Sequence, residues 1–198
     1  MKRGYRFFWH LTRPIVSLIY PRVTHGRENF PHEGACLVCG NHSSGLDPFM
    51  VAYSIGIRSQ IYFMSKAELF RVPVLGFFLK TAGMFPVDRK HGGAAAMKQA
   101  MKLLKSGEKV GIFPEGMRVM KEEESAAKAG AVRLAARMQV PIVPVYIPRK
   151  KKLFRKNHMV IGAPYVLALD KTASAEEFEA AADDLMRRIR ELGEAFDA

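Results

Sequence analysis

The sequence predicts an α/β fold, a single layered domain with a largely parallel central sheet flanked by helices, plus an N-terminal amphipathic helix. Three observations support this prediction. Apolar, strand-like runs recur along the chain, helix-like segments separate most of them, and 198 residues are enough for one domain with a sizeable core. Strands that alternate with helices in this way are typical of parallel sheets.

Residues 1–25 are expected to form an amphipathic segment that lies in a membrane interface. They contain no acid and interleave bases with apolar and aromatic residues, namely Phe7, Phe8, Trp9, Leu11, Ile15, Leu18, Ile19 and Tyr20. Such a composition suits an interfacial helix, although a helix that covers the domain's own core would carry similar residues. No uninterrupted apolar run reaches the roughly 18 residues of a membrane span, and we predict neither a spanning helix nor a signal peptide.

Six runs are predicted as strands, at residues 35–40, 60–65, 83–88, 109–114, 141–147 and 158–163. Helices are predicted between or after them. Asp47 and Pro48 open the first as N-cap and first turn, residues 92–107 form the next and end at Gly107, and an Ala-rich helix covers 125–138. Ser174 and Glu177 predict a capping box that opens a final helix. The charged stretch 117–124 is expected to be a surface loop.

Cys36 and Cys39 have the spacing of a redox or metal pair, but they fall on the predicted strand "ACLVCG". Side chains alternate along a strand, so an offset of three residues places the two thiols on opposite faces. We therefore interpret both as small buried core residues. A chain without disulfides is what a reducing cytosol favours.

The charge balance predicts an anionic partner. Lys and Arg number 31 against 19 Asp and Glu, a formal net charge of +12. Bases gather in residues 1–27 and in "RKKKLFRK" at 149–156, where six of eight residues are basic. Such patches attract an anionic membrane surface, a nucleic acid or an acidic carrier protein, and charge alone does not choose among these.

Polar residues follow three of the predicted strands, where functional residues of parallel sheets collect. The residues are His42 and Asp47, then Asp88 and Arg89, then Glu115, Gly116 and Arg118. A histidine can act as a general base near neutral pH, and a carboxylate can fix its tautomer. A single His and Asp at this spacing are more often a structural histidine beside an aspartate that caps a helix. A functional site is favoured here because all three groups of polar residues follow strand ends.

Four segments carry a family resemblance. "NHSSGLDP" (41–48), "GMFPVDR" (83–89), "FPEGMR" (113–118) and "VPIVPV" (140–145) occur in order. They resemble the four blocks of the glycerolipid acyltransferase family, typified by lysophosphatidic acid acyltransferases. The resemblance spans residues 41–145 and implies that residues 26–198 form an acyltransferase domain.

The resemblance implies a role for each matching residue. His42 would be the base that deprotonates the acceptor hydroxyl, and Asp47 would be its partner. The residues implied in binding the acceptor's phosphate and glycerol are Arg89, Glu115, Gly116 and Arg118, and Lys66 is implied as a further phosphate or donor contact. The family's third block usually has a threonine where Met117 stands here, which leaves the acceptor's identity open.

The reaction implied is transfer of a fatty acyl group from acyl-CoA or acyl carrier protein to the sn-2 hydroxyl of 1-acylglycerol-3-phosphate, giving phosphatidic acid. The alternative is another lysophospholipid or an amino-lipid as acceptor. Ser43 and Ser44 are interpreted as turn residues, so we expect direct transfer without an acyl-enzyme. No metal and no cofactor are expected, because the histidines show no ligand spacing.

Two further alternatives were weighed: a basic module that binds nucleic acid and a related protein that binds lipid without catalysis. The first lacks a nucleic-acid motif and regular aromatic interleaving, so we expect no nucleic-acid partner. The second conflicts with the intact set of predicted catalytic residues. The expected location is the cytoplasmic face of the cell membrane, with peripheral or monotopic attachment.

Overall fold

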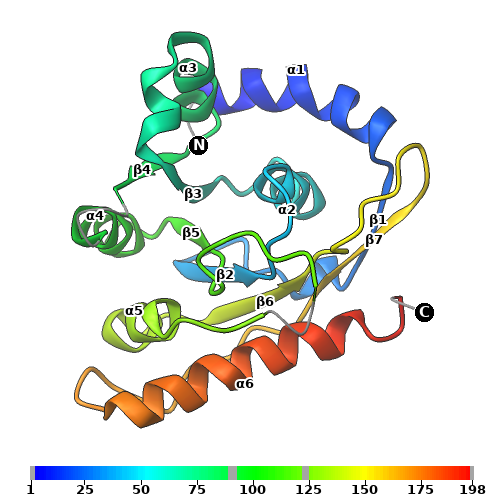
Figure 1. Ribbon diagram of the computed structural model, residues 1–198. Helices are drawn as coiled ribbons and strands as arrows, with labels where there is room; N and C mark the ends of the chain where they lie inside the picture. Colours follow the sequence, from blue (N-terminus) through cyan, green and yellow to red (C-terminus); the bar gives the residue numbers. More distant parts are fainter. Residues whose placement is uncertain (1–2, 89–92, 122–124, 197–198) are drawn as a thin grey trace.

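The computed structural model describes residues 3–88, 93–121 and 125–196. In these residues the strands form one seven-stranded sheet with the order β1-β7-β6-β2-β5-β3-β4 (Figure 1). Neighbouring strands from β6 to β4 are parallel, β7 is antiparallel to β6, and β1 is parallel to β7. The strands are β1 (Arg22–His25), β2 (Cys36–Gly40), β3 (Ile61–Lys66), β4 (Phe85–Val87), β5 (Lys109–Ile112), β6 (Ile142–Tyr146) and β7 (Asn157–Ile161).

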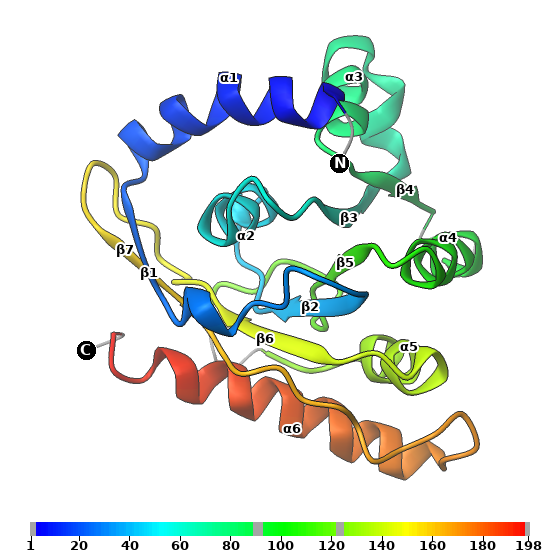
Figure 2. The same ribbon diagram turned by 180° about the vertical axis from the view of Figure 1, so that it is seen from behind.

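Helices cover both faces of this sheet (Figures 1 and 2). One face packs against α1, α2 and α3, and the other against α4, α5 and α6. Two short 3-10 helices, η1 (Arg27–Asn29) and η2 (Ala67–Arg71), lie in connections. The α-helices are α1 (Arg3–Ile19), α2 (Asp47–Ile55), α3 (Pro73–Thr81), α4 (Ala94–Lys105), α5 (Gly130–Met138) and α6 (Ala175–Gly193). The predicted α/β fold with a mostly parallel sheet is therefore confirmed.

The two cysteines show how β2 separates the two cores. Cys36 belongs to the cluster on the side of α2, and Cys39 to the cluster on the side of α5 and α6. Both are free and buried. Burial raises the pKa of both thiols, that of Cys36 to about 12, so neither is a thiolate at neutral pH. The prediction that they occupy opposite faces as core residues is confirmed.

Element by element, the six predicted strands all form. The capping box at α6 is also present: Ser174 Oγ accepts from the Glu177 amide at 3.2 Å, and a Glu177 carboxylate oxygen accepts from the Ser174 amide at 2.7 Å. Two expectations need correction. The Ala-rich helix begins at Gly130 instead of 125, and α3 forms where no helix was predicted.

The N-terminal helix α1 has one face in the core and another in solvent. Tyr5, Phe8 and Trp9 are buried, and the Phe8 ring lies 5.8 Å from that of Phe49 on α2 and 6.0 Å from that of Phe78 on α3. Within the predicted segment 1–25, the described residues 3–25 are therefore packed on the domain and cover part of its core. Among the described helices, none combines the length and apolar character that crossing a bilayer needs.

Candidate active site

His42 and Asp47 meet at the carboxyl end of β2. The ring Nδ1 of His42 lies 2.8 Å from Oδ2 of Asp47. The same oxygen accepts from the backbone amides of Ser43 and Ser44, each at 2.8 Å. An ionised carboxylate can only accept, so Nδ1 carries the proton and Nε2 is the ring nitrogen left to act as a base.

Asp47 was predicted to be the N-cap of the helix, and this prediction is wrong. Asp47 is the first residue of α2, Leu46 occupies the N-cap, and no side chain caps that end. The carboxylate turns back toward residues 42–44 because the amides of Ser43 and Ser44 and the imidazole of His42 donate three hydrogen bonds to it. The Asp47 carboxylate therefore orients the imidazole of His42 and does not cap α2.

The second oxygen of Asp47 is paired with Lys151, which the sequence analysis did not place in the site. Lys151 Nζ lies 2.7 Å from Asp47 Oδ1 and donates to Ser43 Oγ at 2.6 Å and to the Pro148 carbonyl at 3.0 Å. Both side chains are buried, at 7% and 0% exposed. Three oxygens thus surround an ammonium group that has three donors.

The charges in this pair shift each other's pKa. Burial alone would raise the pKa of Asp47, but the bond from His42, the Lys151 ammonium and the Ser44 amide outweigh it, so the pKa is lowered. Burial, aided by the charge of Arg149, lowers the pKa of Lys151 against the opposing effect of Asp47. Asp47 is therefore held as a carboxylate under a buried positive charge.

The third sequence block fixes His42 from the adjacent strand β5. The imidazole stacks on the Phe113 ring with centroids 4.1 Å apart and planes 8° apart. The His42 amide donates to Glu115 Oε2 at 2.6 Å, and its carbonyl accepts from the Val119 amide at 2.7 Å. These contacts hold both the backbone and the ring of His42, the predicted base, in place.

Glu115 was expected to line the acceptor site, but it is 2% exposed. Its Oε1 accepts from Ser125 Oγ and from the Arg149 guanidinium, both at 2.6 Å. With His42 on the other oxygen, the carboxylate is occupied on both sides. The geometry favours a positioning role over the predicted substrate contact.

Arg118 lies against the turn between His42 and Asp47. One guanidinium nitrogen is 3.0 Å from where a Cβ on Gly45 would sit, so a larger residue at 45 would displace it. Arg118 and Met117 are exposed, and Gly116 has the positive φ of 68° that suits glycine. A cation that can donate several hydrogen bonds therefore lies beside the turn that carries His42 and Asp47.

Two other predicted contacts are less closely placed. Lys66 is exposed at the carboxyl end of β3, on the same sheet edge as His42 but two strands along from β2. Arg89 lies outside the described residues. The structure thus brings together His42, Asp47, Glu115 and Arg118.

Arg149 and Lys151 are the functional residues that the sequence analysis assigned elsewhere. Both belong to the basic run 149–156, which was read as a surface for a membrane or a carrier protein. Arg149 bonds Glu115 at 2.6 Å and the Val119 carbonyl at 2.8 Å, and Lys151 pairs with Asp47. Their place shortly after β6, which is parallel to β2, was a signal, because residues beyond the carboxyl ends of parallel strands meet at one edge of the sheet.

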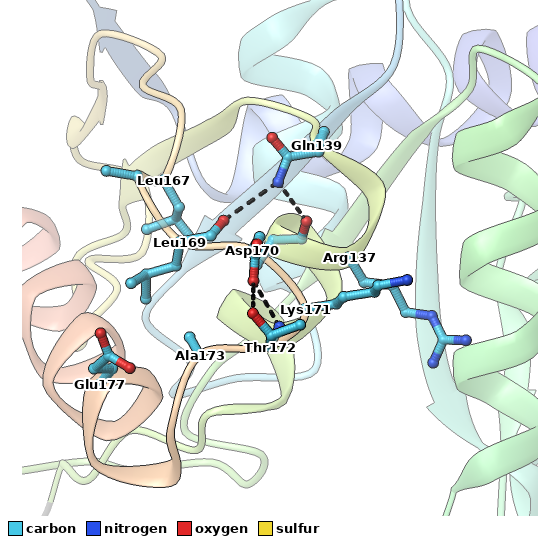
Figure 3. A pocket seen from close by; sticks show the side chains of 11 residues that line it. Arg137, Gln139, Leu167, Leu169, Asp170, Lys171, Thr172, Ala173 and Glu177 are labelled. Atoms are coloured by element: carbon cyan, nitrogen blue, oxygen red, sulfur yellow. Dashed lines mark hydrogen bonds between the residues drawn. The ribbon is translucent and has the colours of Figure 1, made fainter.

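A large hollow of about 730 Å³ lies elsewhere, between the loop that leads to α6 and the end of α5 (Figure 3). There Gln139 donates to the carbonyls of Ala136 and Leu169, and Asp170 accepts from Thr172. Residues 136–139 precede β6, so this hollow sits at the amino end of that strand. His42 follows the carboxyl end of the parallel strand β2, and the hollow is therefore separate from the dyad.

Known proteins were compared with the chain. The family model described as Acyltransferase matches residues 22–148. A 1-acyl-sn-glycerol-3-phosphate acyltransferase of Bacillus subtilis is 36% identical over 200 residues, which is 98% of each chain. A protein of the same name from Borreliella burgdorferi is 30% identical over 137 residues, 68% of this chain and 54% of the relative.

A solved structure agrees in fold. The 1-acyl-sn-glycerophosphate acyltransferase PlsC of Thermotoga maritima matches with a TM-score of 0.67 and 23% identity, over 96% of this chain and 78% of that one. The blocks that carry the His42–Asp47 pair lie within the region matched by the family model. This chain belongs to the acyltransferase family.

Proposed function

We propose that the chain transfers a fatty acyl group from acyl-CoA or acyl carrier protein to the sn-2 hydroxyl of 1-acylglycerol-3-phosphate, giving phosphatidic acid. The observation that carries the proposal is the buried Asp47 carboxylate 2.8 Å from His42 Nδ1, which leaves Nε2 as the base. The names of the Bacillus and Borreliella relatives support this choice of acceptor.

In this mechanism His42 Nε2 takes the proton of the acceptor hydroxyl as the oxygen attacks the thioester carbonyl. The new C–O bond forms, a tetrahedral oxyanion follows, and the C–S bond then breaks. The imidazolium returns the proton to the departing thiolate, so protons and charge balance. Asp47 stabilises the imidazolium and keeps the tautomer, since its Oδ2 accepts from Nδ1.

Lys151 acts as a positioning residue in this scheme. Its ammonium fixes Oδ1 of Asp47 and the hydroxyl of Ser43, so that the other carboxylate oxygen is aimed at the imidazole. It also neutralises the buried carboxylate in the resting enzyme, which favours an uncharged imidazole that is ready to accept a proton.

The contacts of Ser43 support direct transfer without an acyl-enzyme. Its hydroxyl donates to the Arg149 carbonyl at 2.9 Å and accepts from Lys151, so its proton is not directed to His42. We expect no labelled acyl group on the protein when the donor is supplied without acceptor. An adduct that turned over at a competent rate on adding acceptor would contradict direct transfer.

Acceptor recognition is proposed to rest on Arg118, with Arg89, Gly116 and Lys66 as further contacts. A guanidinium binds phosphate with two parallel hydrogen bonds, which an ammonium cannot reproduce. Arg118→Lys should therefore raise the KM for the acceptor while that for the donor changes little. Equal damage to both KM values would point to a structural ion pair instead.

Peripheral attachment to the cytoplasmic face of an anionic membrane is proposed for α1. Phe7, Leu11, Ile15 and Leu18 are exposed on it, and Arg3, Arg6 and Arg13 add positive charge. A row of apolar side chains beside bases suits the headgroup region. In the basic run 149–156, Leu153 and Phe154 are exposed. They are proposed to contact either the membrane or an acyl carrier protein.

The test is a thiol-release assay over a panel of donors and acceptors. We expect 1-acylglycerol-3-phosphate to give the highest kcat/KM among lysophospholipids. The exposed Met117 beside Arg118 keeps another lysophospholipid or an amino-lipid as the alternative acceptor. Absence of thiol release with every pair of thioester and acceptor, from folded protein, would overturn the proposal.

A further inference from the structure

A hollow of about 420 Å³ lies where α1 leads into β1, beside the end of α2. Figure 2 shows α2 inside the bend that α1 and β1 make. The hollow is lined by three arginines, Arg13, Arg22 and Arg27, and by three residues that carry hydroxyl groups, Ser17, Tyr53 and Ser54. None of these belongs to the His42–Asp47 site.

The three arginines meet no acidic side chain among the described residues that line this hollow. Its lining residues include no acid, and residues 1–27 contain none. Burial lowers the pKa of Arg22 to about 10, and the charges of Arg13 and Arg27 contribute to this shift. Such a cluster costs free energy in the empty state, and an anion bound among the three guanidinium groups would offset that cost.

The central guanidinium is held in a fixed orientation. Arg22 donates to Ser17 Oγ at 3.0 Å and lies 5.2 Å from the centre of the Tyr53 ring. The Tyr53 hydroxyl is in turn bonded to Thr12 Oγ1 at 2.5 Å. A guanidinium has five N–H donors, and the bond to Ser17 uses one. The remaining N–H donors of Arg22 are thus oriented before a ligand binds.

Ser54 supplies an independent observation. It is 2% exposed, and among the described residues its hydroxyl has no hydrogen-bond partner. Ser54 is also one of the residues that line the hollow. A buried hydroxyl without a partner is unfavourable. A ligand oxygen in the hollow would provide the missing partner.

We propose that this hollow binds a phosphate group, held by Arg13 and Arg22 and by the hydroxyl of Ser54, at a site separate from that of the acyl acceptor. Forked guanidinium donors match the geometry of phosphate oxygens. The phosphate could belong to a lipid headgroup, since α1 contributes residues to the hollow and also carries the exposed apolar row, or to free phosphate.

The first experiment measures the unfolding temperature with inorganic phosphate against chloride at equal ionic strength. It is done in an Arg118→Gln background, so that binding at the proposed acceptor site does not contribute. We expect phosphate to stabilise this protein, and Arg22→Gln to weaken phosphate affinity roughly ten- to a hundredfold, the range of a charged hydrogen bond. Arg6→Gln, which removes the same charge from an exposed position on α1, is the matched control and should keep the affinity.

Ser54→Ala keeps the test decisive if Arg22→Gln does not fold. It removes a hydroxyl that has no partner in the empty protein, so stability without phosphate should be unchanged while phosphate affinity falls about tenfold. Phosphate that stabilised no better than chloride, or equal losses in Arg6→Gln and Arg22→Gln, would overturn the proposal.

The second experiment identifies the source of the phosphate. Binding to phosphatidylcholine vesicles that contain phosphatidylglycerol is compared with binding to vesicles made equally anionic with a fatty acid. A preference for phosphatidylglycerol that Arg22→Gln loses and Arg6→Gln retains assigns the site to a lipid headgroup. If Arg22→Gln loses the binding of inorganic phosphate but keeps the preference for phosphatidylglycerol vesicles, the site is assigned to free phosphate.

Discussion

At the scale of single residues, Asp47 is the group on which the site depends most. Its side chain is fully buried, with one oxygen toward His42 and two backbone amides and the other toward Lys151. The lowered pKa means that the folded state binds the proton of Asp47 less readily than the unfolded chain does. This difference contributes stability that is present above the unfolded pKa, about 3.9, and is lost as pH falls through the lower folded pKa.

Asp47→Asn should therefore flatten the pH dependence of unfolding in the acid range. It should also destabilise the protein at neutral pH by roughly 3–5 kcal/mol, because Lys151 would be left buried without its partner. Urea unfolding of both proteins, at neutral pH and across the range below pH ~4, measures the two effects. Identical acid dependence in wild type and variant would contradict the assigned role of this carboxylate.

Lys151→Met tests the positioning role at a residue with a close control, because Lys150 is exposed one position earlier. We expect kcat/KM to fall about ten- to a hundredfold, the effect typical of residues that orient a functional group. The acid limb of the pH–rate profile should move to higher pH, because loss of a cation near Asp47 favours the imidazolium.

The other charged groups around the dyad, Glu115, Arg149 and Arg118, are unchanged in this variant. Lys150→Met should leave both rate and profile as in wild type. A Lys151→Met enzyme with an unmoved acid limb would assign Lys151 a purely structural role.

His42 and Asp47 could be predicted from the sequence because they are neighbours in one short turn. Glu115 could be placed near them but not oriented, since its burial depends on Arg149 and Ser125 from other loops. Lys151 was missed because a basic run reads as surface. Which of its bases turn inward is decided by the path of the chain after β6.

At the scale of elements, α1 has a side that packs on the domain and a side that carries the proposed membrane contact. Its exposed side chains Phe7, Leu11, Ile15 and Leu18 recur at spacings of four, four and three residues, which defines one helix face. Tyr5, Phe8 and Trp9 are buried. Deleting residues 1–22 would therefore remove core side chains together with the proposed membrane face, and point substitutions separate the two.

Leu18→Asp should reduce binding to anionic vesicles while the free energy of unfolding changes by no more than about 0.5 kcal/mol, as for exposed positions in general. Trp9→Ala on the buried side should lose roughly 3–5 kcal/mol. Vesicle co-sedimentation and urea unfolding measure the two effects. Undiminished vesicle binding by Leu18→Asp would place the membrane contact on another element.

The elements were predicted best where the pattern was strong. The apolar runs predicted six of the seven strands, β2 to β7, and Ser174 with Glu177 predicted the start of α6. Helix α3 was missed because "PVLGFFLKT" is short and apolar nearly all round, so it has little of the helical periodicity that signals an amphipathic helix. The start of α5 was placed five residues early because alanines at 126 and 127 favour a helix locally.

At the scale of the whole molecule, the sheet assembles the site from distant parts of the chain. Its strand order sets β2 between β5 and β6, so residues 41–47, 113–119 and 147–151 meet at one edge. Strand–helix alternation predicted this edge. It could not predict the reversed strand β7 or the pairing of β1 with it, because apolar alternation does not encode strand direction.

The central claim is that His42 is the base for acyl transfer, and His42→Ala tests it most directly. The Glu115 and Val119 bonds involve the backbone of residue 42, so the variant should keep the turn and fold, although it loses the bond from the imidazole to Asp47. Thiol release with acyl thioester and 1-acylglycerol-3-phosphate should then fall by about a hundred- to ten-thousandfold, the contribution of a general base. Near-wild-type thiol release from a folded His42→Ala protein would contradict the account.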